Sequence, residues 1–217
     1  MEKLEKALKI LLEDLKKKEN NVNQKNKKII GIPVGISNRH IHLSKEHIEI
    51  LFGQNYQLTR LKDLSQLGQY ACKETLIISG PKGSLEKVRV LGPKRSKTQV
   101  EVSIGDCRKL GVTPNIRMSG DLNGTSEIVI IGPKGSLRLK EGVIVAQRHI
   151  HMNSEYATQL NLKNEELVSI EIEGLRGGIL NNVCVRIDDS FTLECHLDIE
   201  EANSVGINPK TLVKIKK

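Results

Sequence analysis

Large aromatic rings are almost missing from this sequence, which has two Phe, three Tyr and no Trp among 217 residues. The core must therefore be built from Val, Ile and Leu. The same shortage argues against a single-stranded nucleic-acid binder, because such proteins stack bases on aromatic side chains. The formal net charge of +8 does not restore that interpretation, because many of the lysines gather near the two ends of the chain. Positive potential serves an anionic small substrate equally well.

Long hydrophobic runs and closely paired cysteines are missing too. No stretch approaches the roughly 18 apolar residues of a transmembrane helix, and no apolar segment with a cleavage site follows the first residues. We therefore expect neither a membrane span nor export through a signal peptide. The four cysteines have no CxxC spacing, which gives no sign of a zinc ribbon or a redox pair. Reduced thiols in a cytosol are the expectation.

Residues 1–20 differ from the rest of the chain in the spacing of their apolar residues. Their apolar residues follow a 3-1-3-1-3 spacing, which predicts an amphipathic helix; they are Leu4, Ala7, Leu8, Leu11, Leu12 and Leu15. Residues 21–30, rich in Asn and Lys, are predicted to be a polar linker. Two interpretations stay open: a helix packed on its own domain or in a homodimer, and a peptide that docks on a partner. A membrane is disfavoured, because the polar face carries both charges and no aromatic anchor.

The chain after Ile29 is typical of short β-strands broken by Gly and Pro. The expected strands are Gly31–Leu43, Glu74–Ser79, Lys87–Leu91, Thr98–Ile104, Glu127–Ile131, Gly142–Met152, Leu167–Ile172, Asn182–Ile187 and Phe191–Leu197. Short helices are expected at Lys45–Phe52, Ser154–Leu160 and Ile199–Ser204. Ser44 and Asn153 are N-cap candidates. Many short strands with few helices predict a mainly β protein, built as barrels or a sandwich.

Two motifs occur twice. Arg-His-Ile-His stands at residues 39–42 and again at 148–151, and Gly-Pro-Lys-Gly-Ser-Leu stands at 80–85 and again at 132–137. Repeats of this length predict two related halves. The glycine motifs lack the Walker pattern for phosphate, and strands flank both copies, so we interpret them as hairpin turns.

The histidines carry the clearest chemical signal. Residues i and i+2 of a strand point to the same face, so His40 and His42 project together, as do His149 and His151. Each pair is a ready chelate for zinc or a similar divalent ion.

Two more residues lie on polar strand faces and are candidate third ligands: His196 and Glu101. Their alternative roles are a structural histidine and an ordinary exposed carboxylate. His47 is expected on the surface. Cys195 is expected to point away from His196, which argues against a cysteine nucleophile. Arg89 and Arg95 flank a Gly-Pro-Lys segment, and a guanidinium binds phosphate with two hydrogen bonds.

At these residues the sequence resembles the PduL-type phosphate propanoyltransferases, the metal-dependent phosphotransacylases of bacterial microcompartments. The similarity runs in order from about Ile32 to Ile207. The segments that carry it are Ile32–Ser44, Gly92–Pro93, Arg95, Thr98–Ser103, Ser119–Leu122, Arg148–Met152, Arg176–Val183, His196–Asp198 and Glu201–Asn203. Residues 103–106 depart from it, reading Ser-Ile-Gly-Asp where the family usually has Ser-Arg-Thr-Asp.

The resemblance implies two interleaved small β-barrels with short helical caps. Residues 31–38 and 147–216 would form the first barrel, and residues 39–146 the second, which carries a helical insert. Two divalent metal ions, expected to be zinc, would lie between the barrels. The implied ligands are His40, His42 and Glu101 for one ion, and His149, His151 and His196 for the other. Arg95 would bind phosphate, and the implied coenzyme A contacts are Ser37, Lys62, Arg89, Leu91 and Asn203.

The implied activity is reversible transfer of a short acyl group, propanoyl first, between coenzyme A and phosphate, by direct attack of phosphate. The alternatives are a metal-dependent acyl-CoA or phosphoester hydrolase and a module in which metal is only structural. The resemblance places the enzyme in the cytoplasm, inside a bacterial microcompartment such as those of propanediol degradation. Residues 1–20 would then dock on shell or cargo proteins. Acyl preference, pathway and oligomeric state stay open, since one methylene is worth only about 1–3 kcal/mol of discrimination.

Overall fold

The computed structural model describes residues 31–216. The predicted helix at 1–20 and the predicted linker at 21–30 lie outside these described residues. The strands are β1 Ile32–Ser37, β2 His40–Ser44, β3 Arg60–Asp63, β4 Tyr70–Ser79, β5 Ser84–Arg95, β6 Gln99–Glu101, β7 Ile116–Arg117, β8 Ser126–Ile131, β9 Ser136–Ala146, β10 His149–Met152, β11 Leu167–Ile172, β12 Gly178–Ile187, β13 Glu194–Asp198 and β14 Leu212–Lys216. The helices are α2 Lys45–Phe52, α3 Ile104–Leu110, α4 Ser154–Leu160 and α5 Ile199–Ser204. None of the helices among the described residues has the length and apolar character needed to cross a membrane.

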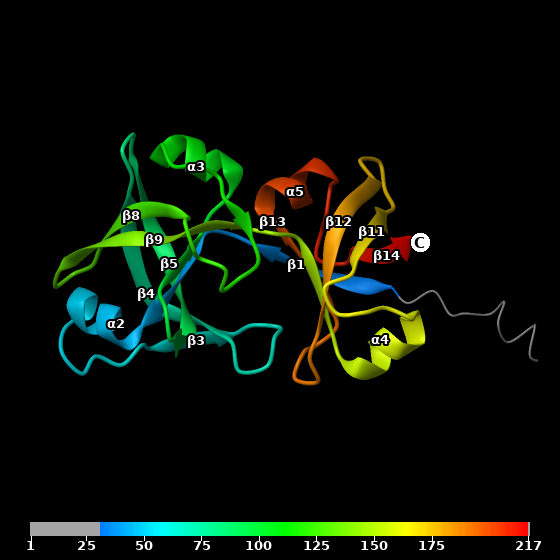
Figure 1. Cartoon of the computed structure of the whole chain (residues 1–217), viewed down its shortest axis with the longest axis horizontal. Helices are drawn as coiled ribbons and strands as arrows, with labels where there is room; N and C mark the ends of the chain where they lie inside the picture. The colour runs from blue at the N-terminus through cyan, green and yellow to red at the C-terminus, as the bar shows by residue number, and fades with distance from the viewer. Residues whose placement is uncertain (1–30, 217) are drawn as a thin grey trace, which may run out of the picture. The chain divides into compact units, whose positions relative to one another are not determined.

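Six strands close into a first barrel in the order β1, β13, β10, β12, β11 and β14 (Figure 1). Strand β1 closes the ring, because it pairs in parallel with β13 and antiparallel with β14. The barrel interior is filled by fully buried aliphatic side chains such as Ile150, Ile170 and Leu197. Its strands therefore come from two separate stretches of the chain, the short β1 and everything from β10 onward.

The middle of the chain forms a second ring of strands. The pairings run β4–β5–β2–β6–β9–β8 and return to β4, while β3 and β7 attach at the sides. Its core is aliphatic, with Ile41, Ile78 and Val90 fully buried. The second barrel is thus inserted between β1 and β10 of the first. The prediction of two interleaved small β-barrels with short helical caps is confirmed for the described residues.

Several expected elements have different bounds in the structure. Two long predicted strands are each broken just before a histidine pair, at residues 38–39 and 147–148. The predicted strand Thr98–Ile104 ends at Glu101, and α3 begins instead, because Ser103 and Asp106 form a capping box. The three predicted helices have the predicted bounds, with Ser44 and Asn153 as their N-caps where we expected them.

Two local expectations were wrong for the same reason, a contact made from a distant segment. His47 is half-buried rather than on the surface, because its Nδ1 lies 2.7 Å from the Thr98 hydroxyl. Phe191, the expected first residue of a strand, precedes β13 instead, and its ring stacks on His151 at 4.0 Å. Neither contact has a signal in the local sequence.

The repeated Gly-Pro-Lys-Gly segments are hairpin turns, as predicted, and each turn also contacts the C-terminal end of a helix. In both turns the first glycine N–H donates to the carbonyl of the second glycine. The Lys82 N–H then donates to the Leu110 carbonyl of α3 at 3.0 Å, and the Lys134 N–H donates to the Leu51 carbonyl of α2 at 3.0 Å. Each turn therefore satisfies a carbonyl that the helix end would leave without a partner. Both copies of the motif therefore hold the end of a helical cap of the second barrel.

Close packing at these turns yields a prediction. A Cβ on Gly80 would lie 2.4 Å from the Leu110 carbonyl oxygen, and one on Gly132 would lie 2.5 Å from that of Leu51. We expect Gly80→Ala and Gly132→Ala each to lower the free energy of unfolding by about 1–3 kcal/mol, the usual cost of overpacking. Urea denaturation measures this. Gly178→Ala is the matched control, because a Cβ there meets nothing within 4 Å, and equal losses in all three variants would contradict the explanation.

Candidate active site

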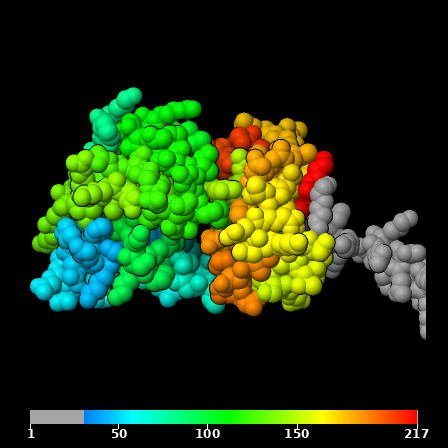
Figure 2. All heavy atoms as spheres, in the orientation of Figure 1, coloured from blue at the N-terminus to red at the C-terminus, as the bar shows by residue number. Residues whose placement is uncertain are grey.

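A cavity of about 590 Å³ is lined by residues of both barrels. In Figure 2 the second barrel runs from blue to yellow-green, and the part of the first barrel that follows it in the chain runs from yellow to red. The cavity walls include the end of β1, both His-Ile-His strands, and the loop that joins β3 to β4. Both sets of predicted metal ligands face it.

The first cluster joins β2 to β6. His40 and Glu101 are direct partners in this antiparallel pair, and His42 follows on the same face. The His40 Nε2 lies 3.4 Å from one Glu101 oxygen, and the His42 Nε2 lies 3.9 Å from the other. All three side chains are buried. The three residues present donor atoms within 4.8 Å of one another.

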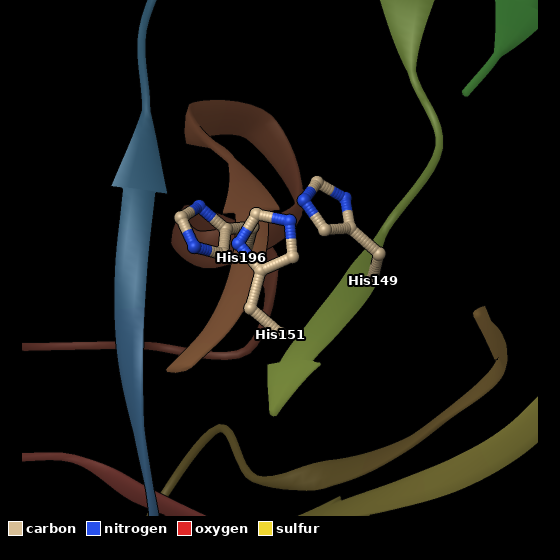
Figure 3. A group of neighbouring side chains, drawn as sticks. All are labelled: His149, His151 and His196. Carbon is tan, nitrogen blue, oxygen red and sulfur yellow. The ribbon is translucent and has the colours of Figure 1, made fainter. Parts of the chain in front are cut away.

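The second cluster joins β10 to β13 in the same way. His149 is the direct partner of His196, and His151 lies on the same face (Figure 3). The ring centroids of His151 lie 4.7 Å from those of His149 and His196, and the rings of His149 and His196 are 4.9 Å apart. One donor atom from each ring again lies within 4.8 Å of the others.

Burial and mutual repulsion keep most of these histidines neutral. Burial and the charge of His40 lower the pKa of His42 to about 3. Burial and the neighbouring His196 lower the pKa of His149 to about 4, and burial with both neighbouring histidines lowers that of His151 to about 2. Their lone pairs are therefore free for a ligand at neutral pH.

The carboxylate of the first cluster is held ionised. Burial alone would raise the pKa of Glu101, but the charge and hydrogen bond of His40, with help from His42 and Arg95, outweigh burial and hold it well below its usual range. The same contact raises the pKa of His40, although burial opposes this. The first cluster is thus an anionic donor set, whereas the second consists of imidazoles alone.

Backbone carbonyls orient the first histidine of each pair. The Nδ1–H of His40 donates to the Asn38 carbonyl at 2.8 Å, and that of His149 donates to the Gln147 carbonyl at 2.8 Å. The carbonyl stands two residues earlier in both cases. Since a carbonyl only accepts, Nε2 of each ring is left for a ligand.

The arginine of each Arg-His-Ile-His motif anchors its strand. Arg39 makes a two-fold ion pair with Asp106, with contacts of 2.9 and 2.8 Å, and Arg148 lies 2.8 Å from Glu201. Both carboxylates stand five residues after the third member of their cluster, at the N3 position of a capping box. Each copy of the Arg-His-Ile-His motif therefore supplies an arginine that anchors the strand, two histidines that face the cavity and an isoleucine that packs in the core.

Buried nitrogens without partners indicate that the clusters fit metal ions. Among residues 31–216, four imidazole nitrogens are buried and have no hydrogen-bond partner: His42 Nδ1, His151 Nδ1, His151 Nε2 and His196 Nε2. Such atoms cost free energy unless something pairs with them. Each cluster offers three donors, two nitrogens and an oxygen in the first and three nitrogens in the second, which match a zinc site that keeps a position open for a substrate.

Arg95 lines the same cavity at the end of β5. Its Nη1 donates to the Ser119 hydroxyl at 2.9 Å, which fixes the guanidinium against the wall. Burial lowers its pKa, the nearby Arg186 adds to the effect, and Glu101 opposes it. Arg186 itself comes from β12 and lies over the Phe191 ring at 5.6 Å. Two guanidinium groups from different barrels therefore face one cavity.

The residues predicted to contact coenzyme A divide into two groups. Ser37, Arg89 and Leu91 line the cavity. Lys62 on β3 and Asn203 on α5 are exposed and stand outside its lining. Arg89 also donates to two backbone carbonyls, those of Cys72 at 3.0 Å and Lys73 at 2.7 Å.

Sequence reasoning missed several residues of the site. Glu194 shares the polar face of β13 with His196, so strand alternation could have found it. Burial would raise its pKa, but contacts with His196, Ser65 and Gln66 lower it to about 2. Arg186 reaches the cavity because β12 pairs with β10, and Phe191 lies in the segment that leads into β13; no local signal predicts either placement.

The cysteines lie apart from this chemistry. All four are buried. Burial raises the pKa of Cys72 and of Cys107 to about 11, and that of Cys195 to about 12. Cys195 is paired with Ile150 on the core face of its strand. These thiols are protonated at neutral pH, which disfavours a cysteine nucleophile.

Comparisons with known proteins identify the family of the chain. The family model described as phosphate propanoyltransferase matches residues 33–208. A phosphate propanoyltransferase of Thermotoga maritima is 52% identical over 186 residues, which cover 85% of the chain and 89% of the relative. Those of Rhodobacter capsulatus, 48% identical over 86% of each chain, and Clostridioides difficile, 47% identical over 88% of the chain and 91% of the relative, are similar as well. The chain therefore belongs to the phosphate propanoyltransferase family, a family of transferases.

Proposed function

We propose that this enzyme converts a short-chain acyl-CoA, propanoyl-CoA first, and phosphate reversibly into acyl phosphate and coenzyme A at a two-metal site. The observation that carries the proposal is the convergence of two ligand clusters and Arg95 on one cavity. The phosphate propanoyltransferase relatives support the phosphate acyltransferase activity. Acyl preference, direction and metals are our inferences.

His40, His42 and Glu101 would hold one divalent ion, and His149, His151 and His196 the other, with zinc as the ion that suits these donors best. When bound, such ions act as Lewis acids that polarise a carbonyl or stabilise a leaving thiolate. The protein's own contribution is to hold the imidazoles neutral and oriented. Glu101 supplies the negative charge that a cation needs in a buried setting.

Arg95 is the proposed phosphate-binding residue. Its guanidinium is fixed by Ser119 and partly buried, so it is organised before a substrate arrives. A guanidinium grips two phosphate oxygens at once and leaves a third free to react. Holding that oxygen beside the thioester carbon supplies the proximity part of catalysis.

The reaction proposed is direct attack. A phosphate oxygen forms a bond to the thioester carbon, the carbon–sulfur bond breaks, and coenzyme A leaves as a thiolate. Phosphate is largely dianionic near neutral pH, so no strong base is required. The buried, protonated thiols of the chain support a route without an acyl-enzyme.

Coenzyme A would enter along the wall formed by Ser37, Arg89 and Leu91. Lys62 and Asn203 are exposed, so they would meet only the outer part of the ligand. Basic residues suit its phosphate groups. All five residues are proposed contacts, and the first three are better placed for the thioester end of the ligand.

The metal ligands provide the main test. We expect His40→Ala and His149→Ala to lose metal and to lower phosphate-dependent release of thiol from propanoyl-CoA by about 100-fold or more, which exceeds the 10–100-fold typical of a residue that only supports a ligand. Metal analysis and a thiol assay on the same sample measure both effects. His47→Ala is the control, because that histidine lies outside both clusters. Full activity in a metal-free variant would refute the proposal.

Free acid released without added phosphate would favour the hydrolase, and no turnover at any metal loading would favour a structural metal module.

Arg95 gives a second test. Hydrogen bonds to charged groups are worth about 1.5–3 kcal/mol, so Arg95→Ala should lower kcat/KM for phosphate by about 10–100-fold. We expect Arg95→Lys to recover only part of this, because an ammonium lacks the planar fork. Steady-state kinetics at varied phosphate measure the change. Arg138→Ala is the control, since Arg138 pairs with Glu127 on the exposed surface, and equal losses in both variants would count against a phosphate role.

We also propose that the enzyme works in the cytoplasm inside a bacterial microcompartment, with residues 1–20 as the segment that docks on shell or cargo proteins. The support is the amphipathic spacing of Leu4, Leu8, Leu11 and Leu15. A chain that begins at Gly31 should keep its activity and its fold but no longer co-purify with shells. Undiminished co-purification of that shortened chain would refute the docking role.

A further inference from the structure

The two ligand clusters are built on strand pairs of identical register. In the second barrel, His40 pairs with Glu101 and His42 with Gln99. In the first barrel, the corresponding pairs are His149 with His196 and His151 with Glu194. Gln99 and Glu194 therefore occupy equivalent positions, each two residues before the third member of its cluster and on the same strand face.

Hydrogen bonds hold the side-chain amide of Gln99 in place. It is only 1% exposed. Its Nε2 donates to a Glu101 oxygen at 2.6 Å and to the Ser119 hydroxyl at 2.8 Å, while its Oε1 accepts from the Gly120 N–H at 2.7 Å. The amide therefore presents an N–H to the carboxylate of the first cluster.

Glu194 is fixed in a corresponding way. Its Oε2 lies 3.0 Å from the His196 Nε2. The same oxygen accepts from the Ser65 hydroxyl and from the Gln66 amide at 3.1 Å. Strand β1, which passes beside the cluster in Figure 3, makes room at Gly35, where a Cβ would lie 2.9 Å from the carboxyl group.

The chemistry of the two positions is complementary to the ligand that each one touches. A carboxylate ligand needs a donor beside it, and Gln99 provides an amide N–H. An imidazole that holds a cation gains positive charge, and the carboxylate of Glu194 lies beside the His196 ring. We propose that Gln99 and Glu194 are matched positioning residues, Gln99 holding Glu101 in the first cluster and Glu194 holding His196 in the second. The proposal rests on the proposed function, which assigns both clusters to metal ions.

The supports of the two positioning residues differ in one respect. Ser119 and Gly120 belong to the second barrel, as Gln99 does. Glu194 belongs to the first barrel, but its supports come from the loop between β3 and β4 of the second. In that loop Gln66 also pairs with the backbone of Thr192, donating to its carbonyl at 3.1 Å and accepting from its N–H at 3.2 Å. The supports of Glu194 therefore come from the other barrel, whereas those of Gln99 come from its own.

Glu200 provides a matched control. This carboxylate of α5 also crosses between the barrels, accepting from the Ser103 hydroxyl at 2.6 Å and from the Gly105 N–H at 3.0 Å. It is absent from both clusters. Glu200→Gln therefore weakens an inter-barrel contact without touching a histidine ligand, which separates loosening of the barrels from loss of the contact to His196.

The test measures zinc affinity at each cluster separately. Full-length His40→Ala/His42→Ala protein retains only the second cluster, and His149→Ala/His151→Ala protein retains only the first. Zinc competition against a chromophoric chelator gives a Kd for each. In the His40→Ala/His42→Ala protein we expect Glu194→Gln to raise the Kd for zinc about 10–100-fold. Ser65→Ala/Gln66→Ala should raise that Kd to a smaller extent, and Gln99→Ala should leave it within about 3-fold. In the His149→Ala/His151→Ala protein, which retains the first cluster, Gln99→Ala should raise the Kd about 10–100-fold, and Glu194→Gln should not.

The outcomes distinguish this inference from the assignment on which it rests. Equal losses from Glu194→Gln and Glu200→Gln, or equal losses at both clusters, would overturn the positioning role alone. So would X-ray absorption showing an oxygen ligand of zinc that disappears in Glu194→Gln, because Glu194 would then be a ligand. No zinc at all in the His40→Ala/His42→Ala protein would overturn the metal assignment of the second cluster itself. If Glu194→Gln does not fold, Glu194→Asp, which keeps the charge on a shorter stem, should show a loss of the same sign.

Discussion

The register of two short antiparallel strand pairs is the constraint on which the site depends. The pairings of β2 with β6 and of β10 with β13 place two alternate histidines opposite a third donor in each barrel. A slip of one residue would turn every ligand into the aliphatic core and every core isoleucine into the cavity. The Arg39–Asp106 and Arg148–Glu201 pairs tie these strands to the helices that follow, which fixes the register at one end.

Burial of so many polar groups is tolerated because nearly every one has a matched partner. The amide of Gln99 meets a carboxylate, the carboxylate of Glu194 meets a hydroxyl and an amide, and the first histidine of each pair meets a carbonyl. The described nitrogens that lack partners lie in the ligand clusters. In a low-dielectric site such atoms are costly, so their concentration where two barrels meet one cavity is itself a signature of ligand binding.

The sequence allowed much of this site to be foreseen, because the determining signals are local. Alternation in a strand shows that His40 and His42 share a face, and the repeat shows that a second site should exist. The mainly β class, three helices and the N-caps of two of them also followed from local patterns. Helix α3 was missed because its capping box overlaps a β-like run at residues 98–104, and two signals competed for the same residues.

The sequence by itself determined the donor types, their pairing along each strand and the hairpin turns, because these depend on spacing of a few residues. Only the tertiary structure decided that Glu101 completes one cluster and His196 the other, since both pairings join segments far apart in the chain. It also decided the role of the glycine repeats at the helix ends, the arrival of Arg186 and Phe191 at the cavity, and the support of Glu194 by Ser65 and Gln66. Each of these is a contact between strands or loops that closure of a barrel brings together, and barrel closure has no signature in any single stretch of sequence.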